Sequence, residues 1–211
     1  MLILQTVFRR ALVLSAVAVL AGCSSTPSAP TAVYDFGLAP AAVGGPRLPT
    51  ALRVTEVVGP GWMDGSAIYY RLAYAQGQRT ELYANSRWVE SPVNLFDARL
   101  RNAVAARGQV VGYGLPEVPT LRIELVDFSQ VFDRPDASRG VVRLRASVFM
   151  ARGLVAQRVV QADVPAPSAD AAGGVSALAQ ASDRAIGEVL DWVAGLSLPA
   201  AAKSAGPTRT P

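Results

Sequence analysis

The first 22 residues constrain the fold most, because they form a targeting segment and no part of a folded domain. Arg9 and Arg10 provide positive charge, and residues 11–20 form an apolar run rich in Ala, Val and Leu. Ten residues in a helix rise only ~15 Å, about half of the ~30 Å hydrocarbon core of a membrane. The sequence therefore predicts a cleavable signal peptide at residues 1–22, and not a transmembrane anchor.

The end of this segment carries the only cysteine of the chain, because Leu20-Ala21-Gly22 stands directly before Cys23. This arrangement resembles the lipobox of bacterial lipoprotein precursors. The resemblance implies that Leu20, Ala21 and Gly22 are recognised by the signal peptidase and that Cys23 carries the lipid. The alternative is an ordinary secretory signal followed by a chance cysteine. That thiol would have no partner for an internal disulfide in an oxidising compartment.

Residue 24 bears on the destination of the lipoprotein. It is Ser, whereas enterobacterial lipoproteins that stay in the inner membrane carry Asp at this position. The resemblance therefore implies a lipid-anchored protein on the periplasmic face of the outer membrane. Membrane contact is expected through the lipid and not through a spanning helix.

Composition excludes most catalytic chemistry. The chain contains no histidine, so Ser-His-Asp and Cys-His catalysis are excluded, and imidazole ligands for zinc are missing. The glycine pairs at 44–45 and 173–174 are not followed by Lys-Ser or Lys-Thr, so no Walker A loop is present. We predict a protein that is not an enzyme and that holds no metal or cofactor.

The charge pattern argues against nucleic acid as a partner. Loss of the signal peptide removes Arg9 and Arg10 and no acidic residue, so the formal net charge falls from +4 to +2. Nineteen of the twenty basic residues are Arg, and they are scattered along the chain without a basic run.

Behind the signal peptide, three regions are expected. Residues 23–32 hold the lipidated cysteine and a polar, Pro-containing tether. Residues 33–197 form the folded domain, which is long enough to bury a core without disulfides. Residues 198–211 lack apolar periodicity and are expected to be disordered.

Hydrophobic patterns predict the elements of the domain. Strands are expected at 33–38, 52–58, 68–74 and 80–84 as a β-meander, then at 121–132, 141–150 and 154–164. Ser91-Pro92 reads as an N-cap followed by a first helical residue, and it opens an amphipathic helix over 92–107. A second amphipathic helix has its apolar stripe between Val175 and Val193. The fold class is α+β, a mainly antiparallel mixed sheet with two amphipathic helices packed on one face.

Several of these segments resemble one known family. Ile68-Tyr69-Tyr70-Arg71, the stretch YANSRWVESP at 83–92 with the helix behind it, and the closing helix with Ala177-Leu178 and Trp192 are similar to the ABC-type transport auxiliary lipoproteins, the PqiC-like family. That family typically shows Arg-Trp, a small residue, an acid and then Pro before its first helix. Val89 and Ser91 depart mildly from the usual residues there.

The resemblance implies a function as well as a fold. It implies a non-catalytic periplasmic subunit that works with an ABC transporter permease and ATPase and with an MCE-domain protein. Such a system moves phospholipid, or another lipid, between the inner and outer membranes. The alternative is a structural or assembly-assisting envelope lipoprotein, related to lipopolysaccharide or efflux.

Two tryptophans receive different interpretations. Trp88 stands where a strand meets a helix, a position that favours a core residue. Trp62 and Met63 lie in the short loop GPGWMDGS, where no strand pattern requires burial. They are candidate contacts with a partner, with a membrane or with a second copy in a homo-oligomer, although folding back onto the domain fits equally well.

Replacing Cys23 by Ser tests the predicted anchor. Without the thiol the lipid cannot be attached, so we expect unprocessed, unlipidated precursor that is lost from the outer-membrane fraction. Intact-mass measurement and membrane fractionation check both points. Normal maturation and normal outer-membrane retention of the Ser variant would contradict the assignment of the anchor.

Overall fold

The computed structural model describes residues 30–39, 44–112 and 118–198. The predicted lipobox residues Leu20, Ala21, Gly22 and Cys23, and nearly all of the predicted tail, lie outside these ranges. In the described part of the chain, no helix is long and apolar enough to cross a membrane.

The described residues form an α+β fold, as predicted from the sequence. In chain order the elements are β1 (Ala32–Tyr34), β2 (Arg53–Val54), the short 3-10 helix η1 (Gly61–Met63), β3 (Ala67–Leu72), α2 (Ala73–Gln76), β4 (Thr80–Trp88), α3 (Pro92–Arg107), β5 (Thr120–Arg134), β6 (Ala137–Met150), β7 (Gly153–Pro165) and α4 (Ala171–Ala194). The strands make one mixed sheet of order β1-β4-β3-β5-β6-β7, with β2 beside β5.

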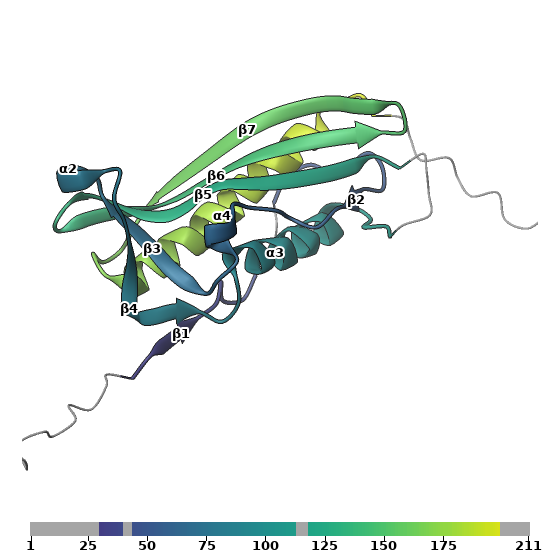
Figure 1. The fold of residues 1–211 in the computed structure, drawn as a ribbon. Helices are drawn as coiled ribbons and strands as arrows, with labels where there is room; N and C mark the ends of the chain where they lie inside the picture. Colours follow the sequence, from purple (N-terminus) through teal and green to yellow (C-terminus); the bar gives the residue numbers. More distant parts are fainter. Residues whose placement is uncertain (1–29, 40–43, 113–117, 199–211) are drawn as a thin grey trace, which may run out of the picture. The chain divides into compact units, whose positions relative to one another are not determined.

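Helix α4 lies along one side of β5, β6 and β7, and α3 lies on the same side of the sheet (Figure 1). The first turn of α4 is capped by Asp170, whose carboxylate accepts a hydrogen bond from the backbone N–H of Gly173 at 2.8 Å. One stripe of the helix, from Val175 to Val193, is buried in the core. The two predicted helices and their common side are therefore confirmed.

Three aromatic rings from distant parts of the chain meet in this core. The Phe36 ring lies 5.5 Å from the Trp88 ring and 5.9 Å from the Phe128 ring, and the Trp88 and Phe128 rings are 5.9 Å apart. Trp88 is only 1% exposed, which confirms its predicted role as a core residue. Contacts at these ring distances contribute beyond area burial, so the trio fastens the segment around Phe36 to the sheet.

The first strand is shorter than the predicted strand 33–38, because a local turn interrupts it. The Asp35 carboxylate accepts a hydrogen bond from the N–H of Gly37 at 2.7 Å. Gly37 adopts φ +66°, a left-handed conformation that glycine tolerates best. The strand therefore ends at Tyr34.

The predicted β-meander is wrong for its first two strands. β1 pairs with β4 in parallel and β2 pairs with β5 in parallel, so neither pairs with its neighbour in sequence. The strand predicted at 52–58 is reduced to Arg53–Val54, because the N–H of Val57 is bonded to the Asp97 carboxylate instead of a strand. The predicted strand 68–74 ends at Leu72, where its parallel pairing with β5 stops and α2 begins.

Gly140 tests how closely α4 sits on the sheet. A Cβ atom at Gly140 would lie 2.6 Å from the backbone of Ala177 and Leu178. Gly140→Ala should therefore lower the free energy of unfolding by about 1–3 kcal/mol, as overpacking of a filled core does. Gly65→Ala, where a Cβ atom meets nothing within 4 Å, is the matched control and should change stability little. Equal unfolding midpoints in urea for both variants would show that the helix does not approach β6 this closely.

Candidate functional site

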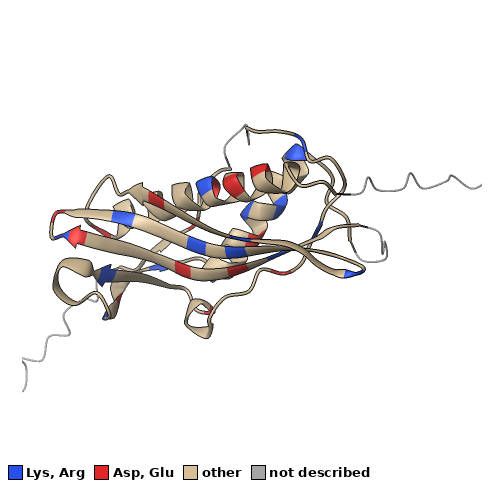
Figure 2. Cartoon of the chain, turned by 90° about the horizontal axis from the view of Figure 1, so that it is seen from above, with Lys and Arg blue, Asp and Glu red and all other residues tan. Residues whose placement is uncertain are grey.

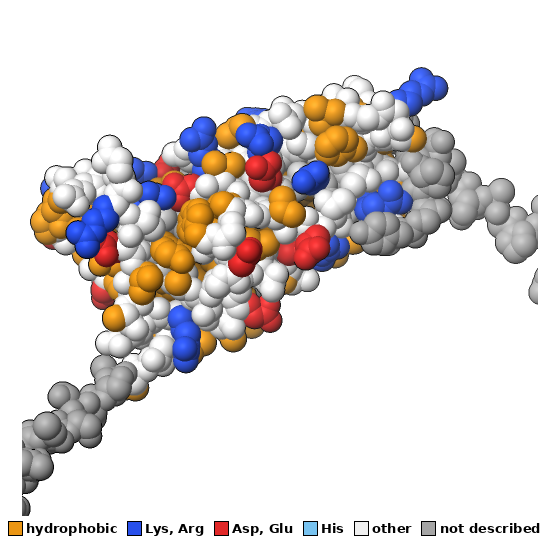
Figure 3. Space-filling model, in the orientation of Figure 1, with side chains coloured by type: hydrophobic (Ala, Val, Ile, Leu, Met, Phe, Trp, Pro, Cys, Tyr) orange, Lys and Arg blue, Asp and Glu red, His pale blue; other side chains and the backbone are white. Residues whose placement is uncertain are grey.

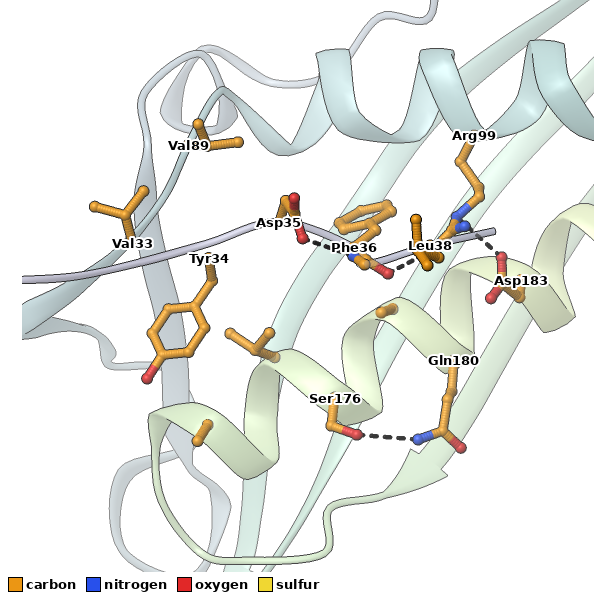
Figure 4. A pocket seen from close by; sticks show the side chains of 14 residues that line it. Val33, Tyr34, Asp35, Phe36, Leu38, Val89, Arg99, Ser176, Gln180 and Asp183 are labelled. Carbon is orange, nitrogen blue, oxygen red and sulfur yellow. Dashed lines mark hydrogen bonds and ion pairs between the residues drawn. The ribbon is translucent and has the colours of Figure 1, made fainter. Parts of the chain in front are cut away.

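A surface groove with a volume of about 640 Å³ is the candidate functional site. It lies between the segment 33–38, the first half of α4, Val89 and Arg99 (Figure 4). Helix α4 contributes the following lining residues: Ala172, Val175, Ser176, Ala179, Gln180 and Asp183. The groove is thus built from three parts of the chain that are far apart in sequence.

The segment 33–38, which we call the entry segment, is held at two points. The carbonyl of Tyr34 accepts a hydrogen bond from the N–H of Val89 at 2.7 Å, and the Phe36 ring is buried in the aromatic trio. The side chains between and beyond these points are not covered. Val33 is 54% exposed and Leu38 is 98% exposed, so the entry segment presents apolar surface to the groove.

Arg99 from α3 connects the walls of the groove. Its Nη2 donates to the carbonyl of Phe36 at 2.5 Å, and its Nε lies 3.2 Å from Oδ1 of Asp183 on α4. The guanidinium also lies 5.9 Å from the centre of the Phe36 ring. The Arg99 side chain is buried, with 8% exposed, whereas the Asp183 side chain is 30% exposed.

The pKa of the Asp183 carboxyl depends on its burial and on its ion pair with Arg99. Partial burial raises the pKa of the Asp183 carboxyl, and the Arg99 guanidinium offsets part of that rise. The two groups neutralise each other at the base of the groove. The ion pair joins α3 to α4, and the bond from Arg99 to the carbonyl of Phe36 joins both helices to the entry segment.

A second polar cluster fixes the start of α4. The Tyr83 hydroxyl donates to the side-chain carbonyl of Gln130 at 2.9 Å, and the Gln130 amide donates to the Ser138 hydroxyl at 2.7 Å and to the carbonyl of Asp170 at 3.1 Å. Burial, followed by the charges of Tyr70 and Asp170, raises the pKa of Tyr83 to about 12. The phenol therefore stays protonated at neutral pH and serves as a structural donor.

The structure separates the two predicted contact residues, Trp62 and Met63. The Met63 side chain is completely buried, so this residue folds back onto the domain, which is one of the two possibilities that the sequence left open. It folds inward because η1 turns the loop back onto the core. Trp62 is half-buried and its ring meets the Tyr69 ring edge-on at 5.0 Å. A partner contact through Trp62 remains a prediction, and neither residue lines the groove.

Figures 2 and 3 show how charged and apolar residues are distributed over the described elements. Basic and acidic residues are interspersed along the strands and helices (Figure 2). On the face shown in Figure 3, hydrophobic side chains form small groups between charged ones. In the described ranges, no cluster of three or more His, Cys, Asp or Glu side chains could hold a metal ion.

Sequence reasoning missed Arg99, although a signal for it exists. Phe96, Leu100, Ala103 and Val104 mark the buried stripe of α3, and Arg99 falls on the same stripe. An arginine among apolar positions at helical spacing indicates a buried cation with a partner. The entry segment and Ser176 gave no comparable signal, because the groove forms only when distant segments meet.

One known protein family matches most of the chain, and solved structures share its fold. A family model described as ABC-type transport auxiliary lipoprotein component matches residues 34–189. No curated protein matches the chain. A crystal structure of a Xanthomonas campestris protein of family DUF330 is similar, with a TM-score of 0.61 and 16% identity over 80% of this chain and 88% of that chain. Another, of an uncharacterized protein, has a TM-score of 0.60 and 15% identity over 78% and 99%. These two likenesses show a shared fold.

Arg99→Met tests the connection at the base of the groove. Removing the guanidinium leaves Asp183 without its counter-charge and the carbonyl of Phe36 without its donor, so stability should fall by about 1–3 kcal/mol at neutral pH. Without Arg99 the pKa of Asp183 rises further. The variant therefore gains stability as the pH falls through that pKa, and its deficit relative to wild type shrinks.

The matched control is Arg101→Met, which removes an arginine from the same helix. Arg101 pairs with Asp97 one turn away and is 39% exposed, so its loss should cost less than about 1 kcal/mol. Thermal unfolding of the three proteins across the acid range measures both effects. A deficit of Arg99→Met that does not depend on pH would show that Asp183 is not the group that loses its partner.

Proposed function

Because the chain belongs to the ABC-type transport auxiliary lipoprotein component family, we propose that it is the non-catalytic outer-membrane subunit of an ABC/MCE-type system. The proposed system moves phospholipid, or another lipid, between the inner and outer membranes. Its other members are an MCE-domain protein and an ABC transporter permease and ATPase. The chain itself contributes a lipid-anchored domain that binds these components.

The observation that carries this proposal is the family match over residues 34–189, which spans most of the predicted domain. The sequence adds independent support. Leu20-Ala21-Gly22 before Cys23 fits a lipid anchor, and Ser24 fits transfer to the outer membrane. The anchor and the family agree on an envelope lipoprotein that serves a transporter.

The groove supports a binding function over a catalytic one. Arg99 and Asp183 are committed to each other, and Arg99 is also bonded to the carbonyl of Phe36. A general acid or base needs a free ionisable group within reach of a substrate. Apolar side chains such as Val33 and Leu38 instead offer contact area, as binding sites do.

The predicted tether adds a geometric constraint to this proposal. Residues 24–31 span at most ~28 Å when fully extended, so the domain stays close to the membrane that holds its lipid. A partner anchored in the inner membrane must therefore reach most of the way across the periplasm. A short tether on this chain and a long periplasmic partner suit an accessory subunit that binds the end of a larger, bridging component.

Affinity purification tests the proposal. The full-length, lipidated protein carrying a C-terminal tag is recovered from membranes in mild detergent, and the MCE-domain and permease proteins of its own organism are measured in the eluate. The matched control fuses residues 1–32 to an unrelated domain, so it keeps the predicted anchor and lacks the family domain. We expect recovery of both partners with the native chain alone.

A second measurement concerns transport itself. A strain without the gene should transfer labelled phospholipid between its two membranes more slowly, and the native gene should restore the rate. The proposal is wrong if neither partner is recovered and phospholipid transfer is unchanged by deletion. Recovery of lipopolysaccharide-assembly or efflux components in place of the MCE-domain protein would favour the assembly role.

A further inference from the structure

We infer that the groove binds an extended segment of the MCE-domain protein of the transport system. This segment adds as a strand beside β1. The inference rests on the proposed function, which supplies the partner. It goes further by naming the surface, the conformation of the bound segment and the side chains that recognise it.

The first argument is the free main-chain edge of β1. In the described sheet, β1 is the terminal strand and pairs with β4 alone. The carbonyl of Tyr34 points toward β4, where it accepts from the N–H of Val89. Backbone groups alternate in direction along a strand, so the N–H and C=O of Val33 and Asp35 point away from β4. These groups can pair with an added strand.

The second argument is the apolar surface beside that edge. Val175 and Ala179 line the groove from α4, and Val33 and Leu38 line it from the entry segment (Figure 4). Leu38 is 98% exposed and Val33 is 54% exposed, so both side chains are accessible to a bound segment. The strand itself is short, Ala32–Tyr34, so an added strand would pair with β1 and the residue directly after it. Strand addition beside a groove is an established way to bind extended peptides.

The third argument is charge. The exposed carboxylate of Asp35 supplies the negative charge of the groove, because the carboxylate of Asp183 is already paired with Arg99. A bound segment that alternates apolar residues and carries at least one Lys or Arg complements this surface. The Asp35 carboxylate also opposes a phospholipid headgroup, since its phosphate carries the same sign of charge.

The probe for this inference is a set of overlapping peptides that cover the periplasmic part of the MCE-domain protein. Binding to the full mature chain is measured by fluorescence anisotropy. We expect one stretch to bind, with alternating apolar residues and a basic residue. Ala179→Trp fills the groove and should weaken binding at least about tenfold. Ala106→Trp makes the same change on the exposed side of α3 and should leave binding unchanged.

Two further variants separate strand addition from apolar contact. Val33→Pro removes one N–H that points away from β4 and leaves the bond between Tyr34 and Val89 in place, so binding should weaken about tenfold without unfolding. Asp35→Asn keeps the acceptor for the N–H of Gly37 and removes the charge. It should weaken binding about threefold at low salt and less at high salt. Thermal unfolding confirms that each variant is folded.

The outcomes distinguish this inference from the proposed function. If the MCE-domain protein co-purifies equally with wild type and Ala179→Trp, and no peptide binds, the groove is not the contact and the proposed function stands. If no partner is recovered at all, the inference falls with the proposed function. Binding of phosphatidylglycerol vesicles that Ala179→Trp abolishes, or occupation by a synthetic peptide of residues 199–211, also overturns it.

Discussion

The close seating of α4 on the sheet is the constraint on which the rest of the domain depends. Gly140 of β6 lies against the backbone of Ala177 and Leu178, and Gly174 of α4 lies against the side chain of Gln130. At both positions a glycine allows the helix and the sheet to approach to a distance that a Cβ atom would prevent. Asp170, which caps the helix and is bonded to Gln130 through its carbonyl, fixes where the helix begins.

The placement of α4 then decides where the other elements of the domain can lie. Arg99 and Arg107 of α3 pair with Asp183 and Asp191 of α4, the latter pair at 2.5 Å, so the two helices are joined at both ends of their contact. Arg99 in turn holds the carbonyl of Phe36. The shape of the groove therefore depends on three contacts in turn: α4 with the sheet, α3 with α4, and the entry segment with Arg99 of α3.

Local signals predicted the long elements well, and nonlocal pairing explains where they failed. The helix predicted at 92–107 has the bounds of α3, because Ser91 accepts a hydrogen bond from the N–H of Asn94, Pro92 opens the first turn and Gly108 ends the last. The long hairpin of β5 and β6 follows from alternation around a polar turn. The short strands β1 and β2 each pair with a strand distant in sequence, and no periodicity within three or two residues encodes such a partner. The groove escaped prediction for the same reason.

The position of the groove at the very start of the domain has a mechanical consequence. β1 follows the predicted tether directly in sequence and is held to β4 through only three paired residues. Force on a lipid-anchored tether would act first on this strand, where few hydrogen bonds resist peeling. A segment bound along the free side of β1 would add hydrogen bonds and raise the cost of detaching it. On the proposed function, partner binding and firm attachment of the domain to its anchor would then reinforce each other, because both act on the same short strand.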